Sequence, residues 1–462
     1  MVASGKICGT PSTPRRGPSW INGSLSLRIP KKNIDSVITS RDLPTLGQPL
    51  ELVQKALEKP LGCPPIKDAV RSTSQVVLLV TDTMADKMGP PHNIGPYLLS
   101  RFNDAGVPDK KITVVHAPGM HGHGGAKQRF GHGWLHRVKY VEHHPHREED
   151  LVFVGTTSMG TPVWVNKAVA EADYVLGVGG CAPSLFGWHG GAGIILPGVA
   201  GRDTIRHNHT YILMDRPICG WGPGNPQRED VQNAGDLAGF KMKIDFTANT
   251  VFAGYHRVEW PTAVEYCQEQ TMTPIQPADI YIMGIGASPN LGCLYMSIEM
   301  AEQATHENGI TILVCSAHEQ PDLLEWSESR ALQQTLDSTD AWLENTGTTI
   351  TSGDAHHLDT LARFRLMQLP IPRLAQVLSR REGEPRSTCM SWSHRRAIER
   401  GRTMIVTEMG EMQAYSYGFA YATKCFDDAL NQAMDTVGTD ARIIVNVPLA
   451  GVPLPPQNRV KG

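Results

Sequence analysis

Histidine is unevenly distributed in this chain, and imidazole is the side chain that can act as acid, base or metal ligand near neutral pH. Eight of the 18 histidines lie between His116 and His146. His121 follows an apolar run within the segment APGMHGHGG, whose glycines let a ligand approach the backbone closely. We therefore predict a catalytic role for His121. A solvated polar loop is the interpretation for five others, namely His132, His136, His143, His144 and His146.

A second pair of histidines, His207 and His209, follows the glycine-rich segment from Gly179 to Gly201. On an extended segment, alternate side chains point to opposite sides, so only one of the two is expected to face a given site. Nickel accepts imidazole readily as a ligand. The alternative interpretation is that both are surface histidines in a polar turn.

Most familiar catalytic motifs are absent. The segment GIGASPNLG does not match the dinucleotide pattern GxGxxG, and it is better interpreted as a tight turn whose amide groups can hold an anion at a helix N-terminus. The sequence contains no P-loop, no GxSxG and no HExxH. Ordinary kinase and hydrolase functions therefore have no support.

Composition favours a small-molecule partner in the cytoplasm. With 43 basic and 46 acidic residues, the net charge of -3 attracts neither nucleic acid nor an anionic membrane surface. The nine cysteines are scattered without a CxxC pair, which is typical of a reduced compartment rather than of disulfides or structural zinc. No stretch approaches the roughly 18 apolar residues of a membrane span, and the first residues contain no apolar signal segment.

Strand and helix patterns alternate along the whole chain. In the first half, strands are expected at 75–82, 111–116, 151–154 and 174–178, with helices at 94–105 and 162–171. In the second half, strands are expected at 279–283, 310–314, 403–407 and 441–447, with helices at 293–305 and 426–434. The segment from Ser379 to His394 is interpreted as a solvated loop or an irregular helical connection.

This alternation predicts an α/β protein with two α/β domains and mainly parallel sheets. We expect an N-terminal domain over 43–270, a C-terminal domain over 271–462, and a disordered or irregular extension over 1–42. The active site is expected in the cleft between the domains.

Several segments together resemble the nickel-dependent lactate racemase family, from about Leu43 to the end of the chain. The resemblance implies two α/β domains around a cleft and a nicotinic-acid-derived pincer cofactor that holds nickel. It also implies hydride abstraction from a 2-hydroxy acid, with one histidine for each face of the substrate. The matching segments are VVLLVTD, APGMH, DLVFVGTTSMGTPVWVNKAVAEADYVLGVGG, ILPGVAGRDTI with Asn208-His209, and GNPQREDV, with looser matches in LYMSIEMA and DARIIVNVPLAGVPLP.

Three positions retain residues that the resemblance implies for the site. His121 matches an acid/base histidine, Asp82 matches an aspartate at the end of a strand, and His209 matches the histidine that ligates nickel. Four positions depart from the family pattern. The expected carboxylate-binding arginine, second histidine, tethering lysine and C-terminal-domain lysine are replaced by Ala85, Ser184, Gly193 and Glu299 respectively.

These departures define the expected site. Glycine has no side chain through which to tether a cofactor, and serine is no proton-transfer base at neutral pH. A pincer would therefore be held non-covalently, and His189 is the candidate for the vacant second base. The predicted site comprises catalytic His121, Asp82 and His189, cofactor-binding Gly190, Gly191, Ser184 and Trp188, and the nickel ligand His209.

Three functions remain open from the sequence. The first is a racemase or epimerase of a 2-hydroxy acid other than lactate, with Trp188 and Met84 lining the substrate space. The second is a metal-dependent lyase or one-way isomerase without the pincer. The third is a non-catalytic ligand-binding relative.

Overall fold

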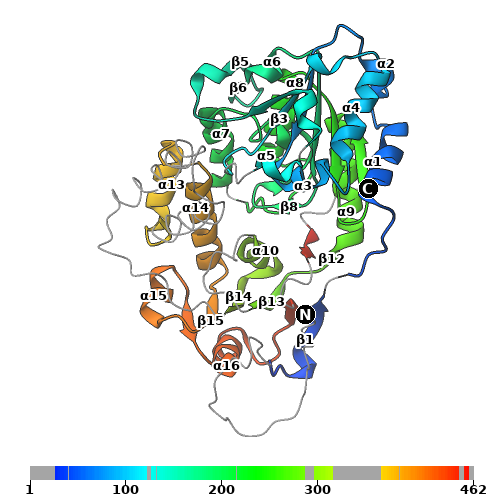
Figure 1. Cartoon of the computed structure of the whole chain (residues 1–462). Helices are drawn as coiled ribbons and strands as arrows, with labels where there is room; N and C mark the ends of the chain where they lie inside the picture. The colour runs from blue at the N-terminus through cyan, green and yellow to red at the C-terminus, as the bar shows by residue number, and fades with distance from the viewer. Residues whose placement is uncertain are drawn as a thin grey trace.

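The computed structural model describes residues 27–39, 41–121, 126–131, 133–214, 216–286, 296–315, 366–383, 385–446 and 452–456. Two six-stranded sheets dominate these residues, and helices pack against each sheet (Figure 1). This arrangement confirms the predicted α/β class with mainly parallel sheets. No described helix is long and apolar enough to cross a membrane.

The first sheet has the order β11-β10-β7-β2-β3-β4. Its strands are parallel except for β11, which pairs antiparallel with β10 at one edge. The strands are β2 (Val76–Val80), β3 (Ile112–His116), β4 (Lys139–Glu142), β7 (Tyr174–Gly180), β10 (Phe240–Phe246) and β11 (Val251–Gly254).

Strand β2 shows why this sheet is covered on both faces. All five of its residues are buried. Leu78 and Val80 belong to one apolar cluster, whereas Val77 and Leu79 belong to another, because successive side chains of a strand point to opposite faces. The helices of this part are α1 (Pro49–Glu58), α2 (Ile66–Ala69), α3 (Ala85–Met88), α4 (Ile94–Asp104), α5 (Ala126–Arg129), α6 (Lys167–Ala170), α7 (Arg202–His209), α8 (Pro226–Leu237) and α9 (His256–Thr271).

The second sheet has the order β1-β17-β13-β14-β15-β16, with every pair parallel. Its strands are β1 (Ile34–Ile38), β13 (Ala278–Gly286), β14 (Thr305–Cys315), β15 (Met404–Val406), β16 (Tyr421–Thr423) and β17 (Ile443–Asn446). The helices of this part are α10 (Ser297–Ala304), α13 (Ile371–Ser379), α14 (Pro385–Arg400), α15 (Glu411–Ser416) and α16 (Phe426–Val437). The short strands β12 (Met272–Pro274) and β18 (Val452–Leu454) pair parallel with each other, and β12 lies between the two sheets in Figure 1.

Strand β1 corrects the prediction of an irregular extension over residues 1–42. It forms the edge of the second sheet, where Val37 is opposite Val445 and Ile38 is opposite Asn446. Ile38 is completely buried, and this burial together with the parallel pairing to β17 stabilises a strand that is too short to be recognised by its own pattern. Residues 1–26 lie outside the described part of the chain.

The predicted helix over 162–171 is also wrong for most of its length. Residues Pro162–Asn166 form β6, which pairs antiparallel with β5 (Leu151–Thr156) outside the first sheet, and only α6 is helical. Pro162-Val163-Trp164-Val165 is rich in residues that favour strands, and β5 is available as a partner.

The third correction concerns Ser379 to His394. Residues from Pro385 onward belong to the 16-residue helix α14, and most of that helix is buried. Its polar residues misled the sequence interpretation, because contacts with α7, α10 and α13 cover them.

The order of the first sheet creates a crevice at the ends of its strands. The chain runs from β2 to β3 on one side and later enters β7 on the other side of β2. At such a switch point the loops after neighbouring strands diverge and leave space for a ligand. Asp82 follows β2, and the segment from Cys181 to Gly193 follows β7.

Candidate functional site

A cavity of about 670 Å³ lies at this crevice. Its wall is formed by the loops that follow β2, β3, β7 and β10. Helix α14 of the second half completes the wall with Arg386 and Met390. The cavity therefore belongs mainly to the first sheet, with one helix from the C-terminal half at its side.

All but one of the predicted site residues line this cavity. They are Asp82, His121, Ser184, Trp188, His189, Gly190 and His209. The exception is Gly191, whose N–H donates to the buried Asp245 Oδ2 at 2.7 Å. Residues from four segments far apart in the sequence are thus brought to one space, and their chemical roles stay predictions.

His121 and Asp82 form a pair at the ends of β3 and β2. The distance between His121 Nδ1 and Asp82 Oδ2 is 3.2 Å. Burial alone would raise the pKa of Asp82, but the hydrogen bond and charge of His121 bring that pKa down to about 2. An ionised Asp82 that accepts a hydrogen bond from Nδ1 leaves Nε2 of His121 as the basic atom. The His121 side chain is 41% exposed, so a ligand can reach it.

His189 lies on the same cavity wall, in the loop after β9 (Gly187–Trp188). Its backbone N–H donates to Ala182 O at 2.7 Å, and the residue is exposed where it lines the cavity. Desolvation by the surrounding protein is the main cause that lowers the pKa of His189 to about 4, and the charges of His121 and Arg228 add to it. His189 is therefore neutral near pH 7 and can accept a proton.

His209 is the last residue of α7 and is almost completely buried. Its ring lies 4.1 Å from the Phe186 ring, measured between centroids. Burial lowers the pKa of His209 to about 3, so the imidazole is neutral, as metal ligation requires. The expectation of an extended RHNH segment is wrong, since a helix contains both His207 and His209, but only His209 lines the cavity.

A buried hydrogen-bond network holds His209. Its Nδ1 is 3.3 Å from Oδ1 of Asn208, and Asn208 Nδ2 donates to Asp230 Oδ2 at 2.8 Å. Asp230 also accepts from Thr157 Oγ1 at 2.5 Å and from Thr161 Oγ1 at 2.8 Å. The network joins three motifs that carry the family resemblance, GTTSMGTP, Asn208-His209 and GNPQREDV. These motifs fix the ring that faces the cavity.

The site fits a nickel group that brings its own donor atoms better than a bare ion. Within the described residues, no three His, Cys, Asp or Glu side chains cluster to hold a metal. His209 can supply one imidazole, because its Nδ1 is held by Asn208 and Nε2 remains as a donor atom. Gly193 lines the cavity without a side chain, so a covalent tether at this position is excluded.

Four charged residues near the cavity were missed from the sequence. Lys243 Nζ pairs with Asp245 Oδ1 at 2.6 Å, and both side chains are buried. Arg228 Nη2 donates to Gly190 O at 2.7 Å. Burial, together with the charge of Asp245, raises the pKa of Glu259 well above its usual range. The available signal was the charge pattern of the strand FKMKIDF, because Lys and Asp are rare in a buried strand without a partner.

Glu299 is not part of the cavity wall. It is fully buried on α10, and its Oε1 is 3.3 Å from His394 Nε2 of α14. Burial raises the pKa of Glu299 to about 8. Ala85, where the resemblance implied an arginine, is the first residue of α3 and is buried as well.

The expected solvated histidine loop is only partly correct. His136 is exposed, but His143 and His144 are buried. His143 Nε2 is 3.0 Å from Ala200 O, which anchors this segment to the loop before α7. His132, and His123 of the APGMHGHGG segment, lie outside the described residues.

Comparisons with known proteins agree with the fold and the motifs. The family described as "Lactate racemase N-terminal domain" matches residues 21–221. The lactate racemase of Lactiplantibacillus plantarum is 26% identical over 280 residues, covering 57% of this chain and 65% of that protein. The lactate racemase of Thermoanaerobacterium thermosaccharolyticum is 24% identical over 307 residues, covering 63% of this chain and 71% of that protein.

Solved structures show the same architecture over most of the chain. The lactate racemase apoprotein from Thermoanaerobacterium thermosaccharolyticum has a TM-score of 0.71 at 20% identity, covering 95% of this chain and 99% of that chain. A crystal structure of a Thermotoga maritima protein has a TM-score of 0.52 at 14% identity, covering 89% of this chain and 100% of that one. The match to the lactate racemase N-terminal domain is therefore confined to residues 21–221, and the solved structures show that the chain shares their fold. In sequence, the chain spans just under two thirds of the first relative's length.

Proposed function

We propose that this protein is a racemase or epimerase of a 2-hydroxy acid. The observation that carries the proposal is that two imidazoles, His121 and His189, line one cavity. The charge of His121 contributes to the lowered pKa of His189, and this proximity supports the proposal. Reversible inversion at a carbinol carbon needs a base for each enantiomer, because the hydroxyl group points differently in the two.

In this proposal the residues of the chain move the hydroxyl proton. Asp82 holds Nδ1 of His121, so that Nε2 takes the hydroxyl proton from one enantiomer and returns it when that enantiomer is re-formed. His189, in the loop after β9, does the same for the opposite enantiomer. Both rings work as bases only when neutral, and the lowered pKa of His189 keeps it so at pH 7.

A nickel pincer, when bound, would supply the acceptor for the hydride from the carbinol carbon. His209 is the residue that would ligate the nickel. The network from Asn208 to Asp230 keeps that ring in a fixed orientation. Because Gly193 offers no tether, we propose that the group is held without a covalent bond to this position.

A metal-dependent lyase or one-way isomerase is the second candidate. It is favoured by the missing tether at Gly193 and by Ser184, which stands where the resemblance implied a histidine. In this case only the His121 and Asp82 pair would act on the substrate. The two candidates differ in reversibility and in the need for a pincer.

The test uses 2-hydroxy acids and sugar acids that carry deuterium at the carbinol carbon. The purified full chain, produced with nickel and with the cofactor supplied, is incubated with each acid, and chirality and deuterium content are measured together with protein-bound nickel. We expect inversion in both directions with deuterium retained. Loss of deuterium to water would show carbon deprotonation instead of hydride transfer, and a one-way or dehydrated product would support the second candidate. No change in any acid would refute both.

A further inference from the structure

Arg228 is a buried cation without an anionic partner in the described structure. Its side chain is on α8, and the residue is only 4% exposed. Nη2 donates to the Gly190 carbonyl, and the guanidinium stacks over Trp260 at 4.8 Å from the ring centroid. Its Nε is buried and has no hydrogen-bond partner among the described residues, and no carboxylate there forms an ion pair with it.

The nearby acidic groups do not compensate this charge directly. Asp245 is already paired with Lys243 at 2.6 Å and also accepts the Gly191 N–H. The pKa of Glu259 is raised by burial, which favours its neutral form. The pKa of Arg228 falls only to about 10, so the guanidinium keeps its charge at pH 7. The group therefore carries one positive charge that none of these neighbours neutralises.

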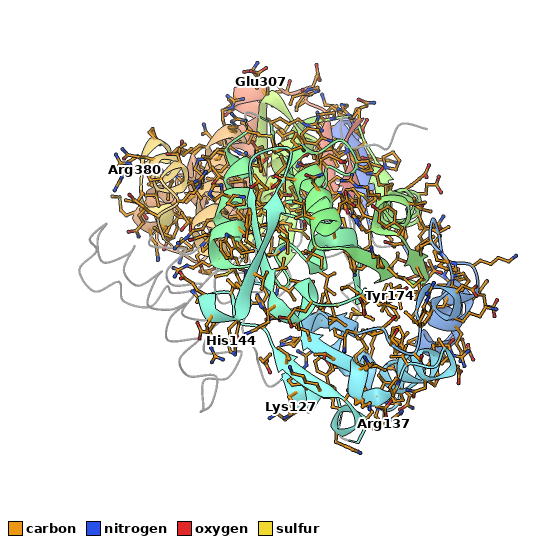
Figure 2. All side chains as sticks on the ribbon, turned by 90° about the horizontal axis from the view of Figure 1, so that it is seen from above. Lys127, Arg137, His144, Tyr174, Glu307 and Arg380 are labelled. Atoms are coloured by element: carbon orange, nitrogen blue, oxygen red, sulfur yellow. The ribbon has the colours of Figure 1, made fainter. Side chains whose placement is uncertain are left out.

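Lys243 and Arg396 are buried as deeply as Arg228, but each of them pairs with a carboxylate. Figure 2 shows Lys127, Arg137 and Arg380 at the edge of the molecule, where water solvates their charges. A buried charge is costly unless a partner of opposite sign accompanies it. Arg228 lines the cavity, so the missing partner can come from a ligand.

Gly193 leaves room for that ligand in front of the guanidinium. A Cβ atom at Gly193 would lie 3.4 Å from Nη1 and 3.9 Å from Nη2 of Arg228. Gly193 lines the cavity beside Arg228, and its lack of a side chain keeps this face open. The space in front of Arg228 is thus the space that a longer side chain at position 193 would occupy.

The charges around the cavity favour an anion. Among the described residues, Asp82 is the one acidic side chain that lines it, and Asp82 is paired with His121. Arg228, Lys243 and Arg386 also line it. A carboxylate or phosphate in front of Arg228 can receive two parallel hydrogen bonds from a planar guanidinium, which a point charge does not offer.

We propose that Arg228 and Gly193 form an anion subsite that binds the carboxylate or phosphate monoester of a cavity ligand. In this subsite, the charge of Arg228 would hold the ligand in place of a covalent bond to a side chain at position 193. It depends on the arginine and the open glycine, not on the proposed racemisation, so either proposal can fail without the other.

The test measures binding of inorganic phosphate, methyl phosphate and lactate to the purified full chain by calorimetric titration. Three variants are compared with the parent protein. Arg228→Gln removes the charge, and Gly193→Asp places an internal carboxylate in front of an intact arginine. Arg137→Gln removes an exposed arginine and serves as the control.

We expect the parent to bind at least one of the three probes. Both cavity variants should weaken that binding by about tenfold or more, and the control should leave it unchanged. Binding of the phosphates alone would assign the subsite to a phosphorylated cofactor, whereas binding of lactate alone would assign it to the substrate carboxylate. If the parent binds none of them, or if Gly193→Asp and Arg228→Gln bind as the parent does, the subsite does not exist. Gly193→Asp keeps the test valid even if Arg228→Gln does not fold.

Discussion

Replacing Asn208 by alanine tests whether the buried network orients His209. Asn208 Nδ2 donates to Asp230 at 2.8 Å, and Asn208 Oδ1 accepts from Gln227 Nε2 at 2.5 Å. The variant loses a hydrogen bond to a charged acceptor, worth roughly 1.5–3 kcal/mol, and leaves the buried Gln227 amide without this acceptor at a cost of about 1–3 kcal/mol. We therefore expect a loss of about 3–5 kcal/mol in the free energy of unfolding.

The same change should also release the His209 ring. Loss of an outer partner of a metal-ligating histidine typically lowers metal affinity by about 10–100-fold. Under the proposed ligation by His209, the purified variant should therefore retain much less nickel. Urea unfolding followed by tryptophan fluorescence gives the stability, and metal analysis gives the nickel content. Asn233→Ala is the matched control, because Asn233 accepts an exposed backbone N–H from Ser158. A stability loss below about 1 kcal/mol with unchanged nickel would refute the role of the network.

Three further predictions concern the cavity and the second sheet. His121→Ala should lower turnover by about 100-fold or more, whereas His136→Ala on the exposed surface should not, as a chiral assay of product will show. Gly190→Ala should lower the free energy of unfolding by about 1–3 kcal/mol and the melting temperature with it, because φ is +98° and a Cβ would lie 2.7 Å from Asp245 Oδ2. An unchanged melting temperature would contradict this. The pKa of Glu299 is raised from 4.5 to about 8, so the folded state binds more protons between these values and the parent should lose stability as pH rises through this range. Glu299→Gln should abolish most of that pH dependence in urea unfolding, and equal slopes in the two proteins would show that Glu299 does not cause it.

The sequence was informative where a local pattern and the tertiary structure agree. Strands β2 and β3 were predicted because their apolar β-branched residues are buried on both faces. Strand β1 was not, because its partner β17 is some 400 residues away and its own pattern is short. Helix α14 was missed because many of its buried residues are polar, and they are covered by contacts with neighbouring helices.

The same distinction applies to the site. His121, Asp82 and His209 were recognisable from their residue types and from the family resemblance. Arg228 was quoted within the GNPQREDV motif but received no role, because its meaning depends on Gly193, which lies 35 residues earlier in the chain. The fold brings these two residues together, and the spacing of residues in the sequence does not predict it.

Strand β1 also bears on whether the two halves can be separated. It precedes the whole first sheet in the chain, yet it completes the edge of the second sheet beside β17. A fragment that starts after α9 would therefore expose the backbone edge of β17, and open strand edges promote aggregation. A fragment that ends there would carry β1 without its partner, so the first sheet is best produced alone from a start after Ile38. To separate the two sheets, the chain therefore has to be cut at two places, before α1 and after α9.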